Sequence, residues 1–143
     1  MGNSNEAASQ VSASIVLAQI LAMRQAAEYQ AAERVRQQVG AQTMALYPDS
    51  SIQNGQVRLM VNTWNTIAGM TTVPGFPWDQ FCSSNPVGFM WDGLYPAIRE
   101  IRKTTRLYAR QFQKLNTSYE KWLKTQPKDY QSQVKQGINA SFG

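Results

Sequence analysis

The stretch PAIREIRKTTRLYARQFQKLNTSYEKWLK, residues 96–124, has the strongest periodicity in the 143-residue chain. Its large apolar and aromatic side chains, with one threonine among them, recur every three or four residues, which places them on one face of an α-helix. The members of this stripe are Ile98, Ile101, Thr105, Tyr108, Phe112, Leu115, Tyr119 and Trp122. The pattern predicts a long helix over residues 96–125, with Pro96 in its first turn.

The same stretch carries most of the positive charge. It holds eight basic and two acidic side chains, whereas the rest of the chain holds six basic and seven acidic ones. The net charge of +5 therefore comes from this one predicted helix. Four of its arginines follow one another at helical spacing, so we expect a basic ridge that contacts DNA phosphates or an acidic partner. The candidate polyanion-binding residues are Arg99, Arg102, Lys103, Arg106, Arg110 and Lys114.

The aromatic members of the stripe are candidate interface residues. Aromatic side chains dominate the binding energy of many protein interfaces. These residues are Tyr108, Phe112, Tyr119 and Trp122. Two interpretations stay open: the stripe anchors another chain, or it packs on the first helix of its own chain.

A second long helix is predicted over residues 5–39, because neither Pro nor Gly interrupts the chain there. At 1.5 Å per residue it would be about 50 Å long, which is too long to be stable without a neighbour along it. Residues at spacings of three and four form its seam: Ala8, Val11, Ile15, Ala18, Ala22, Gln25, Tyr29 and Ala32. Small side chains let helix axes approach closely, so Ile15, Ala18 and Ala22 are further candidate interface residues.

Part of this helix, ASIVLAQILAM at residues 13–23, is apolar on nearly every side. It is shorter than the roughly 20 residues that a bilayer span requires. A helix of this kind must be covered all round. Burial in the core, packing between subunits and transient membrane contact all meet that requirement.

The rest of the chain completes an all-α prediction. Residues 53–68 fit a short helix, although Asn54-Gly55 is also a hairpin signal. Residues 70–95, rich in aromatics and Pro, are predicted to form a loop that folds back on the helices, and residues 126–143 a tail. We expect a single domain over residues 1–143: an elongated hairpin of two long helices, with the short helix and the loop at one end.

The residue types needed for most catalysis are missing or scattered. The chain contains no histidine and one cysteine, Cys82, and it lacks both standard phosphate-binding glycine patterns. Asp79 and Asp92 are interpreted as local caps rather than as an acid–base pair. The sequence therefore predicts a protein that is not an enzyme, with no catalytic residue, cofactor, metal or small-molecule substrate. The opening MGNSNE has no basic region before an apolar run, so no secretion signal is predicted.

The apolar stretch ASIVLAQILAM followed by RQAAEYQAAERVRQQ (residues 24–38) resembles the start of small internal or ejection-type proteins of tailed-phage virions. The resemblance covers residues 12–38. It implies a helical, non-enzymatic virion protein that lines or plugs the exit route of the particle and can associate with the host envelope. A fainter resemblance, in residues 107–122, is to helical pilus components of conjugation systems, which carry secretion signals.

Together these patterns predict a structural component of a multi-subunit particle, such as a phage virion. It would pack through its helices against copies of itself or other subunits, and its basic helix would meet DNA. Two alternatives stay open: a free-standing nucleic-acid-binding module, and a membrane-active or pilus-type secretion component.

Overall fold

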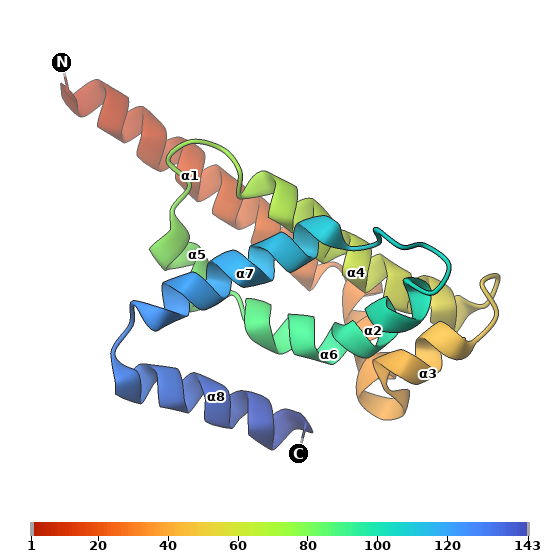
Figure 1. The fold of residues 1–143 in the computed structure, drawn as a ribbon. Helices are drawn as coiled ribbons and strands as arrows, with labels where there is room; N and C mark the ends of the chain where they lie inside the picture. Colours follow the sequence, from red (N-terminus) through yellow and green to blue (C-terminus); the bar gives the residue numbers. More distant parts are fainter. Residues whose placement is uncertain (1, 143) are drawn as a thin grey trace.

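The computed structural model describes residues 2–142, including the side chains of residues 11–137, and this part of the chain is all-helical (Figure 1). The predicted all-α class is confirmed. The predicted hairpin of two long helices is not seen, because both of its helices are interrupted. The observed helices are α1 (Gly2–Gln25), α2 (Ala27–Val39), α3 (Ala41–Leu46), α4 (Ile52–Met70), α5 (Trp78–Ser84), α6 (Val87–Ile101), α7 (Arg110–Lys124) and α8 (Lys128–Phe142).

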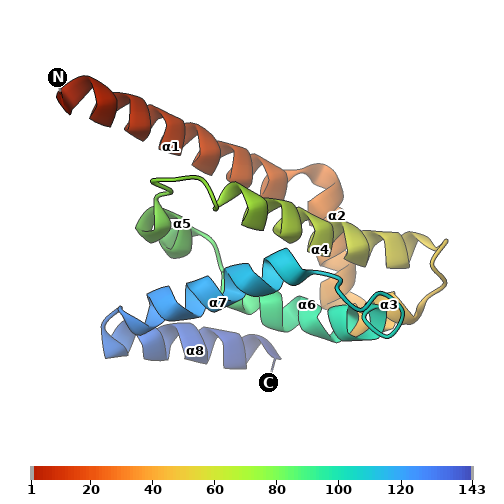
Figure 2. The same cartoon turned by 45° about the horizontal axis from the view of Figure 1, so that its top comes forward.

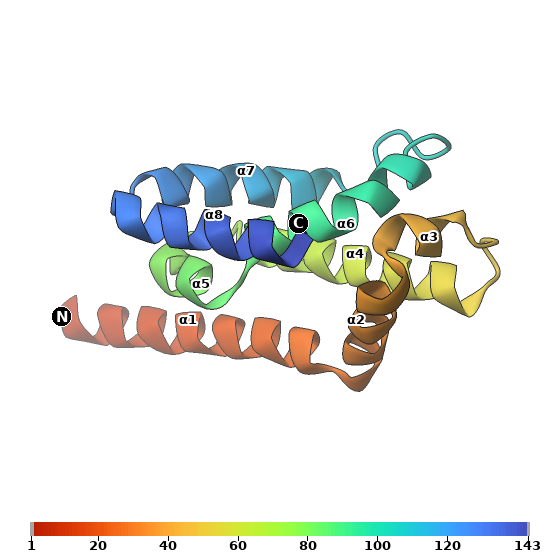
Figure 3. The ribbon, with the colours of Figure 1, turned by 90° about the horizontal axis from the view of Figure 1, so that it is seen from below.

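Helix α4 lies at the centre of the arrangement and contacts α2, α3 and α7. Figures 2 and 3 show α1 on one side of α4, with α6, α7 and α8 on the other. The N-terminal part of α1 extends past the ends of the neighbouring helices in all three views. One long helix is therefore covered along only part of its length.

The sequence around Asn54 forms the start of α4, not a hairpin. The Ser51 hydroxyl caps the helix by accepting a hydrogen bond from the Asn54 amide at 3.1 Å. The Asn54 side chain donates to the carbonyls of Ala45 and Tyr47, and so holds the preceding turn. The short helix predicted at 53–68 is thus confirmed and extended to Met70.

The helix predicted over residues 5–39 ends at Gln25, because Ala26 adopts an extended backbone with φ −57° and ψ 139°. Long-range contacts stabilise the break on both sides. The Arg24 guanidinium donates to Asn85 Oδ1 at 2.7 Å, and Trp64 Nε1 donates to Tyr29 Oη at 2.8 Å. Local helix propensity, which is high here, is overridden by tertiary structure.

The helix predicted over residues 96–125 is also interrupted. Helix α6 ends at Ile101, and α7 starts after Ala109, which has the left-handed φ of 64°. Between them Arg102 holds the turn: its Nε donates to the Tyr108 carbonyl at 2.8 Å and its Nη2 to Gln113 Oε1 at 2.8 Å. Pro96 lies inside α6 rather than at a helix start.

The segment predicted as an aromatic loop, residues 70–95, contains α5 and most of α6. Three of its rings, Phe76, Trp78 and Phe81, meet edge to face with centroids 5.1–6.1 Å apart. The segment does fold back on the helices, since Trp122 Nε1 donates to Asp79 Oδ1 at 2.7 Å and joins α7 to α5. The predicted tail is helical as well, and forms α8.

Candidate functional site

The outer face of α1, which we define as Val11, Ile15, Ala18 and Ala22, is an exposed apolar stripe. These four side chains follow one another at spacings of four, three and four residues, and all four are exposed. Val11 is 60% exposed and Ile15 is 53% exposed. The predicted seam residue Ala8 lies outside the described side chains. The candidate interface residues Ile15, Ala18 and Ala22 are thus uncovered.

The opposite face of α1 packs on the protein. Val16, Leu17 and Met23 contact the core, and Ile20 is fully buried in it. Tyr29 and Ala32, which the sequence placed on the same seam as Ile15, are buried in α2. The break at Ala26 therefore separates a covered half of the seam from an exposed half.

The aromatic stripe of residues 108–122 lies against the protein itself. Phe112 is fully buried, stacks on Trp64 with ring centroids 5.7 Å apart, and meets Trp91 edge to face at 5.0 Å. Tyr119 is 5% exposed, while Tyr108 and Trp122 are half-buried. Of the two interpretations the structure shows packing within the chain, but on α4 and α6 rather than on the first helix. Phe112 and Tyr119 are therefore covered by the chain itself, whereas Tyr108 and Trp122 remain partly exposed.

The predicted basic ridge is not formed, since α6 ends before Arg102. Arg102 is instead tied into the turn, and its guanidinium lies 6.0 Å from the centre of the Trp91 ring. Lys103 pairs with Glu100 at 2.9 Å. The remaining candidates gather around the α6–α7 connection as exposed side chains without a hydrogen bond or ion pair in the described part of the chain. We call this set the basic corner: Arg99, Arg106, Arg110 and Lys114.

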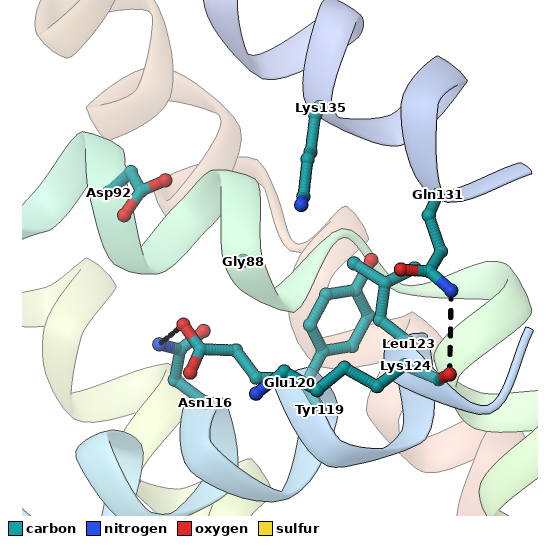
Figure 4. A pocket seen from close by; sticks show the side chains of 9 residues that line it. All are labelled: Gly88, Asp92, Asn116, Tyr119, Glu120, Leu123, Lys124, Gln131 and Lys135. Carbon is teal, nitrogen blue, oxygen red and sulfur yellow. Dashed lines mark hydrogen bonds between the residues drawn. The ribbon is translucent and has the colours of Figure 1, made fainter. Parts of the chain in front are cut away.

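A groove of about 450 Å³, lined by apolar as well as polar side chains, lies between α6, α7 and α8 (Figure 4). Its two carboxylates come from different helices, Asp92 from α6 and Glu120 from α7, and the Asn116 amide of α7 lies beside Glu120. Lys135 of α8 reaches into the groove from the opposite side in Figure 4. The other lining residues are Gly88, Tyr119, Leu123, Lys124 and Gln131.

Asp92 and Asn116 are in unfavourable surroundings in this groove. Partial burial and the negative charge of Glu120 raise the pKa of the Asp92 carboxyl. Asn116 is 8% exposed, and its Nδ2 donates a long hydrogen bond of 3.5 Å to Glu120 Oε1. Its Oδ1 atom is buried and has no hydrogen-bond partner in the described structure. Such an acceptor is destabilising unless a donor reaches it.

Gly88 sets how closely α6 approaches α7 at this groove. A Cβ atom on Gly88 would lie 3.1 Å from Tyr119 Cε1, and the Tyr119 ring is buried. We expect Gly88→Val to lower the free energy of unfolding by about 1–3 kcal/mol, because the branched side chain overpacks this contact.

The matched control is Gly55→Ala in α4, where an added Cβ has no atom within 4 Å. This change should raise the free energy of unfolding by about 0.5–1 kcal/mol through helix propensity. Urea denaturation followed by circular dichroism measures both variants. Equal effects would contradict the close contact at Gly88.

The groove is not predictable from the sequence patterns above, because it requires α6 and α8 where those patterns predict a loop and a tail. A usable signal is present in α6: Val87, Met90, Leu94, Ala97 and Ile101 recur at spacings of three and four. Pro96 obscures this signal, since proline is typical of a helix start and so favours a boundary in the middle of the repeat.

Among the described residues, neither a metal centre nor a membrane span is found. No group of three or more of their His, Cys, Asp or Glu side chains is arranged to hold a metal ion. No helix there combines the length and the apolar character that crossing a membrane requires.

Compared with protein-family models, with curated proteins and with solved structures, the chain shows no match in any of the three.

Proposed function

We propose that this protein is a non-catalytic structural subunit whose copies join through the outer face of α1. The observation that carries the proposal is the exposure of Val11 and Ile15 on the side of α1 opposite to the buried Ile20. A surface helix of a monomer normally turns polar side chains to water on that side. Here both sides are apolar, as expected for a helix with a second neighbour.

The outer face suits a second copy of the same chain in antiparallel orientation. Its apolar positions are spaced almost evenly about Ile15, with Val11 four residues before it and Ala18 three residues after it. An antiparallel copy would place Ile15 opposite Ile15 and Val11 close to Ala18. Such a contact is isologous, which is the commonest symmetry of protein dimers. The alanines let the two axes approach closely.

The distribution of charge favours this face over the rest of the surface as the place where two copies meet. The chain carries a net charge of +5, so two copies repel each other over much of their surface. Residues 7–23 of α1 contain no Asp, Glu, Lys or Arg. Two copies can therefore meet along this helix without bringing like charges together.

Sedimentation equilibrium of the purified chain tests the proposal. We expect a concentration-dependent dimer of micromolar affinity, because a contact about three helical turns long is smaller than a standard interface. Ile15→Glu should weaken dimerisation at least 100-fold, since the new carboxylate would be buried without a partner. Gln38→Glu, which adds the same charge on the exposed end of α2, is the control and should leave dimerisation unchanged.

A monomer at all concentrations, or equal weakening by both variants, would refute self-association through α1.

The particle that we propose for this subunit is a tailed-phage virion, on the strength of the sequence resemblance of residues 12–38. Immunodetection of the protein in purified phage particles tests this proposal.

A second candidate function, contact with DNA, is favoured by the basic corner. Its four side chains come from α6, the connection and α7; all are exposed, and none forms an ion pair in the described structure. Exposed cations of this kind bind phosphates without regard to sequence.

We expect the triple variant Arg99→Glu, Arg106→Glu and Arg110→Glu to weaken DNA binding at least tenfold in 50 mM salt, and less in 300 mM salt. The slope of log K against log salt should fall by about 0.9 for each phosphate that the variant no longer neutralises. The control carries the same change of charge on α7 and α8: Lys121→Glu, Lys124→Glu and Lys128→Glu. Fluorescence anisotropy with a labelled duplex measures both. Equal weakening by the two triple variants would refute a localised site.

A further inference from the structure

We propose that one end of the molecule, formed by the α3–α4 and α6–α7 connections (residues 47–51 and 102–109), binds the surface of an anionic phospholipid bilayer. In Figures 1 and 3 both connections lie at the end opposite to the N-terminus of α1. Arg58 of α4 links them. Its Nη2 lies 3.7 Å from Asp49 Oδ1 on the first connection, and its guanidinium carbon lies 5.9 Å from the centre of the Tyr108 ring on the second.

The first argument is a group of large apolar side chains that water reaches at this end. Leu107 in the α6–α7 connection is 62% exposed, and Ile52, which follows the α3–α4 connection, is 76% exposed. Leu46 and Tyr47, at the start of the α3–α4 connection, are exposed as well. We call these four side chains the apolar tip. Exposed apolar side chains that gather in one place mark an interaction surface.

The second argument is the positive charge beside the apolar tip. Leu107 lies between Arg106 and Arg110 of the basic corner, whose side chains form no ion pair in the described structure. Asp49 and Glu100, which also lie at this end, are each paired with a basic side chain. The end therefore keeps an unbalanced positive charge, and an anionic lipid surface attracts such a charge.

The combination of charge and apolar side chains favours a bilayer over DNA. DNA phosphates would meet the basic corner but would leave Ile52 and Leu107 in water. A phospholipid surface offers phosphates to the cations and, just beneath them, hydrocarbon to the apolar tip. Tyr47 suits the boundary between the two, because its ring is apolar and its hydroxyl is polar. Charge and apolar insertion together give the two signals that stable binding to a membrane surface requires.

Co-sedimentation of the full chain with vesicles tests the proposal. Vesicles of phosphatidylcholine and phosphatidylserine should bind at least tenfold more tightly than vesicles of phosphatidylcholine alone. The double variant Ile52→Ser and Leu107→Ser should bind the anionic vesicles at least tenfold more weakly than the wild type, since it removes two inserting side chains. Both positions are exposed, so the variant should fold, which circular dichroism checks.

The matched control is the double variant Leu21→Ser and Val73→Ser. It removes two apolar side chains that are 48% and 47% exposed, on α1 and on the α4–α5 connection, away from the proposed end. This variant should bind anionic vesicles as the wild type does. Equal weakening by the two double variants, or no binding of the wild type to anionic vesicles, would overturn the proposal.

A fluorescent label reports insertion directly. In a Cys82→Ala background, a nitrobenzoxadiazole dye on Leu107→Cys should become brighter and shift to the blue with anionic vesicles, because the dye leaves water. The same dye on Val73→Cys should not change. Equal changes at the two positions would contradict insertion at this end.

Binding of duplex DNA, measured in parallel, separates the two partners of the basic corner. Ile52→Ser with Leu107→Ser should leave DNA binding unchanged, and an equal loss of DNA and vesicle binding would overturn the proposal. The apolar tip is separate from the outer face of α1, so the proposal does not depend on self-association. Vesicle binding by a chain that stays monomeric would support it and would refute only the joining of copies through α1.

Discussion

Trp64→Ala should lower the free energy of unfolding by about 3–5 kcal/mol, a large part of the roughly 5–15 kcal/mol by which a typical domain is stable. Trp64 is fully buried in α4 and connects four helices. Its ring stacks on Phe112 of α7, its Nε1 donates to Tyr29 of α2, and the Arg24 guanidinium of α1 lies 5.7 Å from its ring centre. The substitution removes all of these interactions and leaves a large cavity.

Urea denaturation followed by circular dichroism measures this effect. Leu107→Ala, at a side chain that is 62% exposed, is the control and should change stability by less than about 0.5 kcal/mol. Trp64→Phe keeps a ring in place but removes the donor to Tyr29, so an intermediate destabilisation of about 1–2 kcal/mol is expected. A destabilisation below about 1 kcal/mol in Trp64→Ala would show that the four helices do not meet at this residue.

Alkaline pH should destabilise the fold by several kcal/mol between pH 9 and pH 12. Burial raises the pKa of Cys82, Tyr29 and Tyr119 to about 12 each, from ordinary values of 9.0 for the thiol and 10.0 for the phenols. All three groups are neutral when protonated, so the folded state holds their protons more tightly than the unfolded state. Their contribution to stability is complete below pH 9 and is lost as the pH rises toward 12.

The expected slope in this range reaches about 1.4 kcal/mol per pH unit for each group that is protonated in the folded state and ionised in the unfolded one. Urea midpoints measured from pH 8 to pH 11 test this dependence. Cys82→Ala removes the group with the lowest ordinary pKa, so it should flatten the curve first, near pH 9–10. Stability that stays constant up to pH 11 would contradict the burial of these three groups.

The elements that the sequence predicted correctly are those whose own periodicity decides them. The helix of residues 53–68 is an example, since Val57, Met60, Val61 and Trp64 form a stripe that ends up buried. The prediction of two uninterrupted long helices was wrong for a different reason. The break at Ala26 is held by Arg24, Tyr29 and their partners more than 30 residues away, and no local pattern reports such contacts.

The same distinction, between local patterns and tertiary contacts, applies to the candidate sites. The apolar character of the helix that carries Ile15, Ala18 and Ala22 can be recognised from its own sequence; the three residues are exposed, and their role as contact residues stays a prediction. The burial of Phe112 and Tyr119 is one of two interpretations that the sequence leaves open, since periodicity shows that residues share a face but not what covers it. The basic corner replaces the predicted ridge because the turn at residues 102–109 interrupts the helix.

The most direct test of the central proposal, that the outer face of α1 joins two copies, is disulfide cross-linking in a Cys82→Ala background. For antiparallel helices, Ile15→Cys should form a dimer rapidly under mild oxidation, and a mixture of Val11→Cys and Ala18→Cys should give the mixed dimer in excess over either homodimer. Ser132→Cys, exposed on α8, should stay monomeric at the same concentration. Cross-linking of Ile15→Cys no faster than that of Ser132→Cys would contradict the account.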